Sequence, residues 1–92
     1  MESLGNPATD PVLIWLNGGP GCSSLLGAFL ENGPFVYDDG TGDYLKPNQY
    51  TWNTRANVLY IESPAHVGFS MGGPNDYNFT DMTQSVDLFA AL

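Results

Sequence analysis

An uninterrupted apolar run, residues 12–16, leads directly into a glycine-rich turn at residues 17–21. A run without polar alternation predicts a strand that is covered on both faces, as in parallel sheets. Because Gly18, Gly19 and Gly21 lack a Cβ, a ligand can approach the backbone N–H groups of the turn. The helix expected after the turn favours negative charge there. The turn is therefore predicted to hold either a bound carboxylate or the oxyanion of acyl transfer.

The middle of the chain predicts a helix and then a hairpin. Either Ser23 or Ser24 is placed to cap the helix, and Asn32-Gly33-Pro34 is a stop signal for it. The glycines of residues 38–42 are suited to close a hairpin between residues 35–37 and 44–45. The apolar residues predicted to share one face of the helix are Leu25, Leu26, Phe29 and Leu30.

The last third of the chain begins with a second buried-type strand at residues 57–61, followed by a Gly/Pro/Asn-rich stretch. A helical pattern starts at about Asp81, and Asp81 with Gln84 resembles a capping box. The residues predicted to share a face of this helix are Met82, Val86 and Phe89.

The order strand, helix, hairpin, strand, helix predicts an α/β fold. Two buried-type strands with so little helix cannot cover both faces of a parallel sheet. Single α/β domains also commonly run to roughly 200–250 residues. Residues 1–92 are therefore expected to be an incomplete piece of one larger domain, cut near the helix at residues 81–92.

The composition excludes several kinds of partner. Ten acidic against two basic residues give a net charge of −8, whereas nucleic acids and anionic membranes attract clustered Lys and Arg. No run approaches the ~18 apolar residues of a membrane span, and the first seven residues do not form a signal peptide. Neither cysteines nor histidines cluster as metal ligands, and the turn lacks the ending of a phosphate loop. We expect no nucleic acid, membrane, metal or cofactor.

Three blocks of sequence resemble the N-terminal part of the serine carboxypeptidases. They are WLNGGPGCSS at 15–24, LENGPF at 30–35 and NQYTWNTRANVLYIESPAHVGFS at 48–70, and the similarity runs from about Asp10 to the end. The resemblance implies a partial α/β-hydrolase fold, consisting of the N-terminal strands, the oxyanion turn and the first helices. It also implies a Ser–Asp–His triad and release of C-terminal amino acids from peptides, in vacuoles, lysosomes or secretions.

The resemblance implies roles for five residues. Gly19 would give an oxyanion-hole N–H, while Asn17 and Gly18 would bind the carboxylate of the substrate through neutral donors. Glu31 matches a carboxylate-recognising glutamate that shares a proton with a second glutamate, absent here, and Trp15 lines the same site. The alternatives are a turn held by its own hydrogen bonds, an exposed Glu31 at a helix end and a core position for Trp15.

Two further residues are weighed as catalytic groups and rejected. Gly68-Phe69-Ser70-Met71-Gly72 fits G-x-S-x-G, but Pro64 interrupts after the strand and no helix follows, so Ser70 is not expected to be a nucleophile. His66, where the family usually has glycine, is the only histidine. Without the elbow serine or an orienting aspartate it does not make a triad.

Two positions are candidates for covalent modification. Cys22 is the single cysteine, so a disulfide would need a partner elsewhere, and a buried free thiol is the alternative. Asn78-Phe79-Thr80 is an N-glycosylation sequon, which matters only if the protein is secreted.

The sequence thus predicts a segment of a serine-type carboxypeptidase, inactive alone because the triad is missing. Its partners would be the remainder of the hydrolase domain and the C-terminus of a peptide substrate. Two alternatives stay open: a segment of a related acyltransferase, or a non-catalytic binding or decoy product of a truncated gene.

Overall fold

The central element of the computed structural model, which describes residues 1–37, 40, 45–74 and 76–92, is a parallel strand pair. Strand β1 (Val12–Trp15) pairs with β4 (Asn57–Tyr60). Both lie inside the two predicted strands, which are thereby confirmed. The register places Trp15 beside Tyr60, so these two side chains share one face of the pair. The carboxyl ends of the two strands therefore meet at the same edge.

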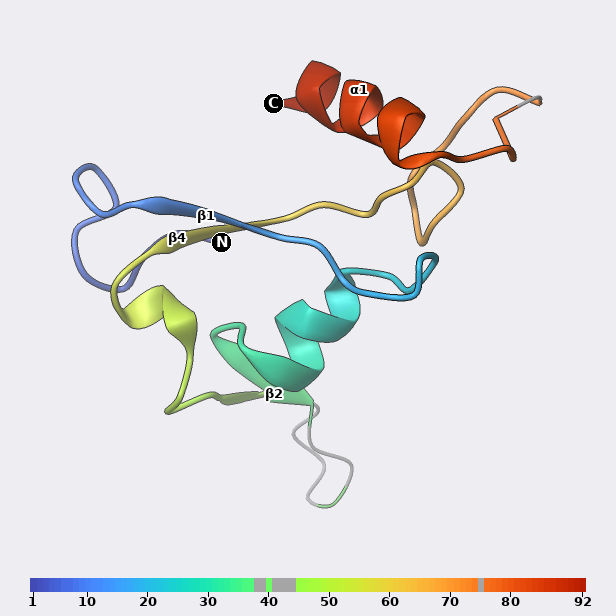
Figure 1. The fold of residues 1–92 in the computed structure, drawn as a ribbon. Coiled ribbons are helices and arrows are strands. Elements are labelled where there is room, and N and C mark those ends of the chain that lie inside the picture. Colours follow the sequence, from blue (N-terminus) through green and yellow to red (C-terminus); the bar gives the residue numbers. More distant parts are fainter. Residues whose placement is uncertain (38–39, 41–44, 75) are drawn as a thin grey trace.

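The other elements lie on either side of this pair. On one side are the π-helical segment η1 (Gly27–Glu31), the hairpin of β2 (Phe35–Tyr37) with β3 (Leu45–Pro47), and the 3₁₀ turn η2 (Trp52–Thr54). Helix α1 (Asp81–Ala91) lies on the other side (Figure 1). This arrangement is a small α/β unit.

The hairpin confirms the predicted pairing, with Phe35 opposite Pro47 and Tyr37 opposite Leu45. The turn predicted at residues 38–42 lies outside the described residues except for Gly40. No helix in the described part of the chain combines the length and the apolar character that a membrane crossing requires.

The face of the strand pair that carries Trp15 is covered by η1 and η2. Val58 on this face is 1% exposed, and a Cβ added to Gly27 of η1 would collide with the Trp15 indole. Side chains alternate along a strand, so Val12, Ile14 and Leu59 point to the opposite face. These three are 66%, 45% and 41% exposed. Within the described residues only one face of the pair is therefore covered, as the sequence predicts for two strands with so little helix.

A polar hub, which the sequence analysis did not anticipate, joins the N-terminal residues to β4. Asn53 is fully buried, and its Nδ2 donates to the carbonyls of Met1, Glu2 and Ala56 at 3.0, 3.2 and 3.3 Å. The Met1 carbonyl also accepts from the backbone N–H of Val58 at 2.9 Å. The buried amide of Asn53 thus holds the N-terminal residues beside β4 through hydrogen bonds.

The predicted helix after the turn exists, and the four apolar residues predicted to share one of its faces line one groove. Gly27 and Ala28 are buried, whereas Leu26 and Leu30 are 41% and 56% exposed. Small residues allow a close approach to β1, so they and not the leucines face it. The larger side chains line a shallow apolar groove of about 470 Å³, made by Ser23, Leu25, Leu26, Phe29, Leu30, Tyr37 and Leu45.

Helix α1 begins at Asp81 as predicted, but its capping box differs. The box is formed by Thr80 and Thr83, because the residue before the first helical position is the one whose side chain reaches the free N–H groups. Gln84 instead donates from Nε2 to Ser63 Oγ at 3.1 Å. The predicted apolar face is exposed at Met82, Val86 and Phe89, by 74%, 59% and 83%.

Candidate functional site: the glycine turn at the carboxyl ends of the strands

Trp15 fixes the side chain of Asn17 at the entrance to the turn. The indole Nε1 donates to Asn17 Oδ1 at 2.9 Å. Trp15 is itself held between Gly27 and the ring of Trp52, which it meets edge to face at a centroid distance of 5.4 Å. An indole N–H can only donate, so it selects the oxygen of the amide. Among the described residues no acceptor takes Asn17 Nδ2, whose two N–H groups are free to bind a ligand.

The backbone of the turn requires glycine at two positions. Gly19 and Gly21 have φ angles of +140° and +113°, and a Cβ on Gly19 would lie 2.8 Å from the backbone nitrogen of Gly21. The turn is closed by a hydrogen bond from Cys22 N to Gly18 O at 3.4 Å. Gly18 and Gly19 are exposed, and within the described ranges nothing accepts their N–H groups. The turn thus presents neutral donors to solvent.

Two consecutive serines connect the turn to the end of β4. Ser24 is 1% exposed; its Oγ donates to the Ile61 carbonyl at 2.5 Å and accepts from the Asn17 N–H at 3.1 Å. Ser23 Oγ donates to the Glu62 carboxylate and accepts from the Leu25 N–H at 3.2 Å. Of the two proposed caps, Ser23 therefore accepts from an N–H at the start of the helix, whereas Ser24 accepts from the N–H of Asn17.

Glu62 is a site residue that the sequence analysis missed. Its carboxylate also accepts from Phe69 N at 2.5 Å, while its own carbonyl accepts from Ser70 Oγ at 2.6 Å. The hydrogen bond from Ser23, and then that from Phe69, hold the pKa of Glu62 below its ordinary value of 4.5. The signal was present, because parallel strands bring the residues after each carboxyl end together.

Glu31, the site carboxylate that the sequence analysis did predict, is not joined to the turn. It is exposed at the end of η1, and no hydrogen bond among the described residues links its carboxylate to Asn17 or Trp15. The next residue, Asn32, is 6% exposed; its Oδ1 accepts from Tyr60 OH at 2.9 Å, and its Nδ2 has no partner in the described part of the chain.

The residues rejected as catalytic groups are held in a loop. Ser70 lies in a turn with no helix directly after it, and its hydroxyl donates to the Glu62 carbonyl at 2.6 Å. His66 has a φ of +68°, which suits the glycine usual in the family better than histidine. Its ring stacks on Tyr77 at 4.2 Å and lies 3.2 Å, by Nε2, from the Gly73 carbonyl.

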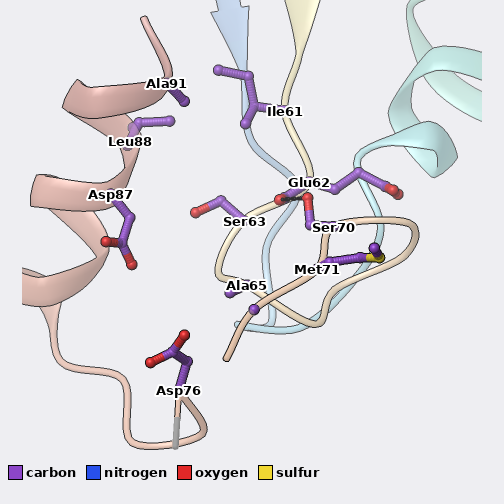
Figure 2. A pocket seen from close by; sticks show the side chains of 11 residues that line it. Ile61, Glu62, Ser63, Ala65, Ser70, Met71, Asp76, Asp87, Leu88 and Ala91 are labelled. Carbon is purple, nitrogen blue, oxygen red and sulfur yellow. Dashed lines mark hydrogen bonds between the residues drawn. The ribbon is translucent and has the colours of Figure 1, made fainter. Parts of the chain in front are cut away.

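A cleft of about 300 Å³ lies between α1 and the loop that follows β4 (Figure 2). Glu62, Asp76 and Asp87 line it, and none of its lining residues among those described is basic. Such a lining repels a carboxylate.

The predicted modification sites are accessible. Cys22 is exposed and carries a free thiol, so the buried-thiol interpretation is wrong. Asn78 is exposed just before α1. The described residues contain no group of three or more His, Cys, Asp or Glu side chains arranged to hold a metal ion.

Comparison with known proteins identifies the family. The sequence pattern described as "Serine carboxypeptidase" matches residues 1–92. Serine carboxypeptidase S10 family member 1 of Dictyostelium discoideum is 47% identical over 92 residues, 99% of this chain and 22% of that protein. Lysosomal protective protein of Mus musculus is 49% identical over 92 residues, 100% of this chain and 19% of that protein.

Carboxypeptidase Y of Saccharomyces cerevisiae is 49% identical over 82 residues, 87% of this chain and 15% of that protein. The chain thus spans between 15% and 22% of the length of these three relatives. A match along all 92 residues, at nearly half identity, confirms the resemblance found in the sequence: the chain belongs to the serine carboxypeptidase family.

Proposed function

We propose that the chain is the part of a serine-type carboxypeptidase that holds the terminal carboxylate of a peptide and half of the oxyanion hole. The observation that carries this proposal is the fixed amide of Asn17. Trp15 occupies its oxygen at 2.9 Å, which leaves its two N–H donors without an acceptor among the described residues, next in the chain to the exposed Gly18. Neutral donors satisfy a carboxylate without burying a permanent positive charge.

Gly19 is proposed to donate its backbone N–H to the oxyanion that forms when the peptide bond is attacked. Its φ of +140° and the nearby Gly21 nitrogen exclude any side chain, which keeps the N–H accessible. A preorganised donor of this kind acts on charge that develops only in the transition state. Glu31 is proposed to approach the carboxylate only together with the second glutamate of the family, which agrees with its exposed position here.

The remainder of the domain is proposed to be a longer α/β-hydrolase chain, of which residues 1–92 are the N-terminal part. The bare strand face of Val12, Ile14 and Leu59 supports this, since parallel sheets are stable with both faces covered. The same remainder would supply the triad of serine, aspartate and histidine. Residues 1–92 alone are therefore proposed to be inactive, because loss of the nucleophile and base removes most of the rate of a hydrolase.

The compartment is proposed to be a lysosome, a vacuole or the secretory route, which agrees with a relative named as lysosomal. There Asn78 could carry a glycan and Cys22 could form a disulfide with a cysteine outside these residues. Both positions are exposed. We propose no cofactor, since the chemistry needs only the triad and the donors of the turn.

The test is a chimera in which residues 1–92 replace the matching segment of the Dictyostelium discoideum serine carboxypeptidase. We expect the chimera to release the C-terminal amino acid from an N-blocked dipeptide. The substitution Gly19→Ala should lower kcat by about 100-fold, the usual scale of one oxyanion donor. Gly73→Ala is the matched control, because Gly73 lies outside the glycine turn and a Cβ there meets only the side chain of Asp76. A folded chimera that releases no amino acid would contradict the proposal, as would full activity of Gly19→Ala.

A further inference from the structure

The segments 17–24 and 61–70 are connected by side chains, although they are far apart in the sequence. Both follow the carboxyl end of a strand, and β1 and β4 are hydrogen-bonded neighbours. Ser24 connects the Asn17 N–H to the Ile61 carbonyl. Ser23, one residue earlier, connects the other end of the turn to Glu62. The turn is thus attached to β4 by two separate side-chain links.

The two links hold different parts of the turn. Ser24 and Trp15 both act on Asn17, at its backbone N–H and its side-chain oxygen. Ser23 lies after Gly21 and Cys22, so its bond to Glu62 fixes the side of the turn that follows Gly19. Removing one link leaves the other in place.

Glu62 is itself held on two sides. Its Oε1 accepts from Ser23 and its Oε2 accepts from Phe69 N at 2.5 Å. A Cβ on Gly68, whose φ is +56°, would collide with the Glu62 carboxylate, so the loop closes directly over it. Figure 2 shows Ser70, at the end of this loop, beside Glu62, at its start. Because the loop holds the Glu62 carboxylate in place, the carboxylate is a fixed hydrogen-bond acceptor for Ser23.

We infer that Glu62 is a positioning residue for the oxyanion hole: through Ser23 it keeps the glycine turn in the conformation that presents the Gly19 N–H. This inference rests on the proposed function. Glu62 does not contact substrate, and it acts only through the hydroxyl of Ser23. The lowered pKa agrees with an anchor that is ionised in mildly acidic surroundings.

The test uses the chimera defined above, with Ser23→Ala, Glu62→Gln and the double variant. Glu62→Gln keeps the shape of the side chain but cannot accept from both Ser23 and Phe69. We expect each single variant to lower kcat by about tenfold, less than deletion of an oxyanion donor, and to change KM by less than about twofold. Because both residues act through one bond, the double variant should also lose about tenfold and not about 100-fold.

Two controls separate positioning from general damage. Glu2→Gln removes the same charge from an exposed carboxylate and should leave kcat unchanged. Ser23→Thr keeps the hydroxyl and should recover most of the kcat lost in Ser23→Ala. Multiplied effects in the double variant, or Glu62→Gln with lower thermal stability and unchanged kcat, would overturn the inference.

A second readout does not depend on catalysis. Amide hydrogen exchange of Cys22, whose N–H closes the turn onto the Gly18 carbonyl, should become at least about threefold faster in Glu62→Gln and Ser23→Ala than in Glu2→Gln. If the parent chimera is inactive, the proposed function fails while this measurement still tests the role of Glu62. Unchanged exchange in both variants would show that Glu62 does not hold the turn.

Discussion

The glycine turn and the open apolar faces of the molecule differ in how far the 92 residues supply their contacts. In the turn, Asn17, Ser23 and Ser24 all find hydrogen-bond partners within the 92 residues. The apolar residues Val12 on β1 and Phe89 on α1 remain 66% and 83% exposed. Directional polar contacts form between two short segments, whereas burial of apolar area needs a larger body around it. The site geometry is therefore local, and the stability that supports it is not.

The largest effect is expected at Asn17, whose amide is the centre of the polar region. Asn17→Asp removes both free donors and places a negative charge beside the carboxylate of the substrate. We expect kcat/KM of the chimera to fall by about 100-fold for a peptide with a free C-terminus, on the scale of a lost charge-assisted bond and an added repulsion. The C-terminal amide of the same peptide should be affected by less than about threefold.

The control for this prediction is Gln49→Glu, which adds the same charge at an exposed position. If Asn17→Asp lowers kcat/KM equally for the free and the amidated peptide, Asn17 does not bind the carboxylate.

A smaller effect, on the free energy of unfolding, is expected where η1 packs on Trp15 of β1. Gly27→Ala would push a methyl group into the Trp15 indole and cost about 1–3 kcal/mol, as overpacking does. Gly18→Ala meets nothing within 4 Å and should change the free energy of unfolding by less than about 0.5 kcal/mol. Urea unfolding of both chimera variants measures the difference. Equal stability of the two variants would mean that Trp15 is not packed on η1.

The next prediction compares a covered with an open valine. Val58→Ala should destabilise the chimera by about 2 kcal/mol, for two lost methyl groups and the resulting cavity. Val86 is 59% exposed here. If the remainder of the domain covers α1, Val86→Ala should lower the free energy of unfolding of the chimera by about 1 kcal/mol. A cost of Val86→Ala below about 0.5 kcal/mol would show instead that this face stays open in the longer protein.

The smallest effect concerns pH. The folded state lowers the pKa of Glu62 from 4.5, mainly through Ser23 and then through Phe69. A lowered carboxyl pKa contributes stability that is present above the unfolded value and lost as the pH falls through the folded value. The urea midpoint of the parent should therefore fall more steeply than that of Glu62→Gln between about pH 5 and pH 3. Parallel curves would contradict this. Asp10, also lowered by Ser3, is present in both proteins and cancels.

Most elements of the fold could be predicted from the sequence, because each depends on short-range signals. The apolar runs located β1 and β4, the glycines located the turn, and the pattern after Asp81 located α1. The capping box was misplaced by one residue, since Thr80 and Asp81 are both suitable caps in sequence. The roles of Asn17, Gly18 and Gly19 in the candidate site came from the resemblance to the family, and they stay predictions.

The parts that could not be predicted depend on contacts between distant segments. Asn53 reads as an ordinary loop asparagine, yet it is fully buried against carbonyls more than fifty residues away. Glu62 bonds to Ser23 across 39 residues. The burial of Gly27 and Ala28 in η1 depends on such contacts as well, because these residues face β1 only after the strands have paired. Strand order, once known, would have placed Glu62 beside the turn.

The most direct test of the central claim is a titration of the selectively labelled chimera with an N-acetylated amino acid, followed by amide NMR. We expect the side-chain NH₂ of Asn17 and the backbone N–H of Gly18 to shift and to saturate together, while Gly73 and Asn78 stay unchanged. The corresponding amino-acid amide, which lacks the carboxylate, should shift neither group. If the acid inhibits the chimera while the resonances of Asn17 and Gly18 do not move, the glycine turn is not the carboxylate site.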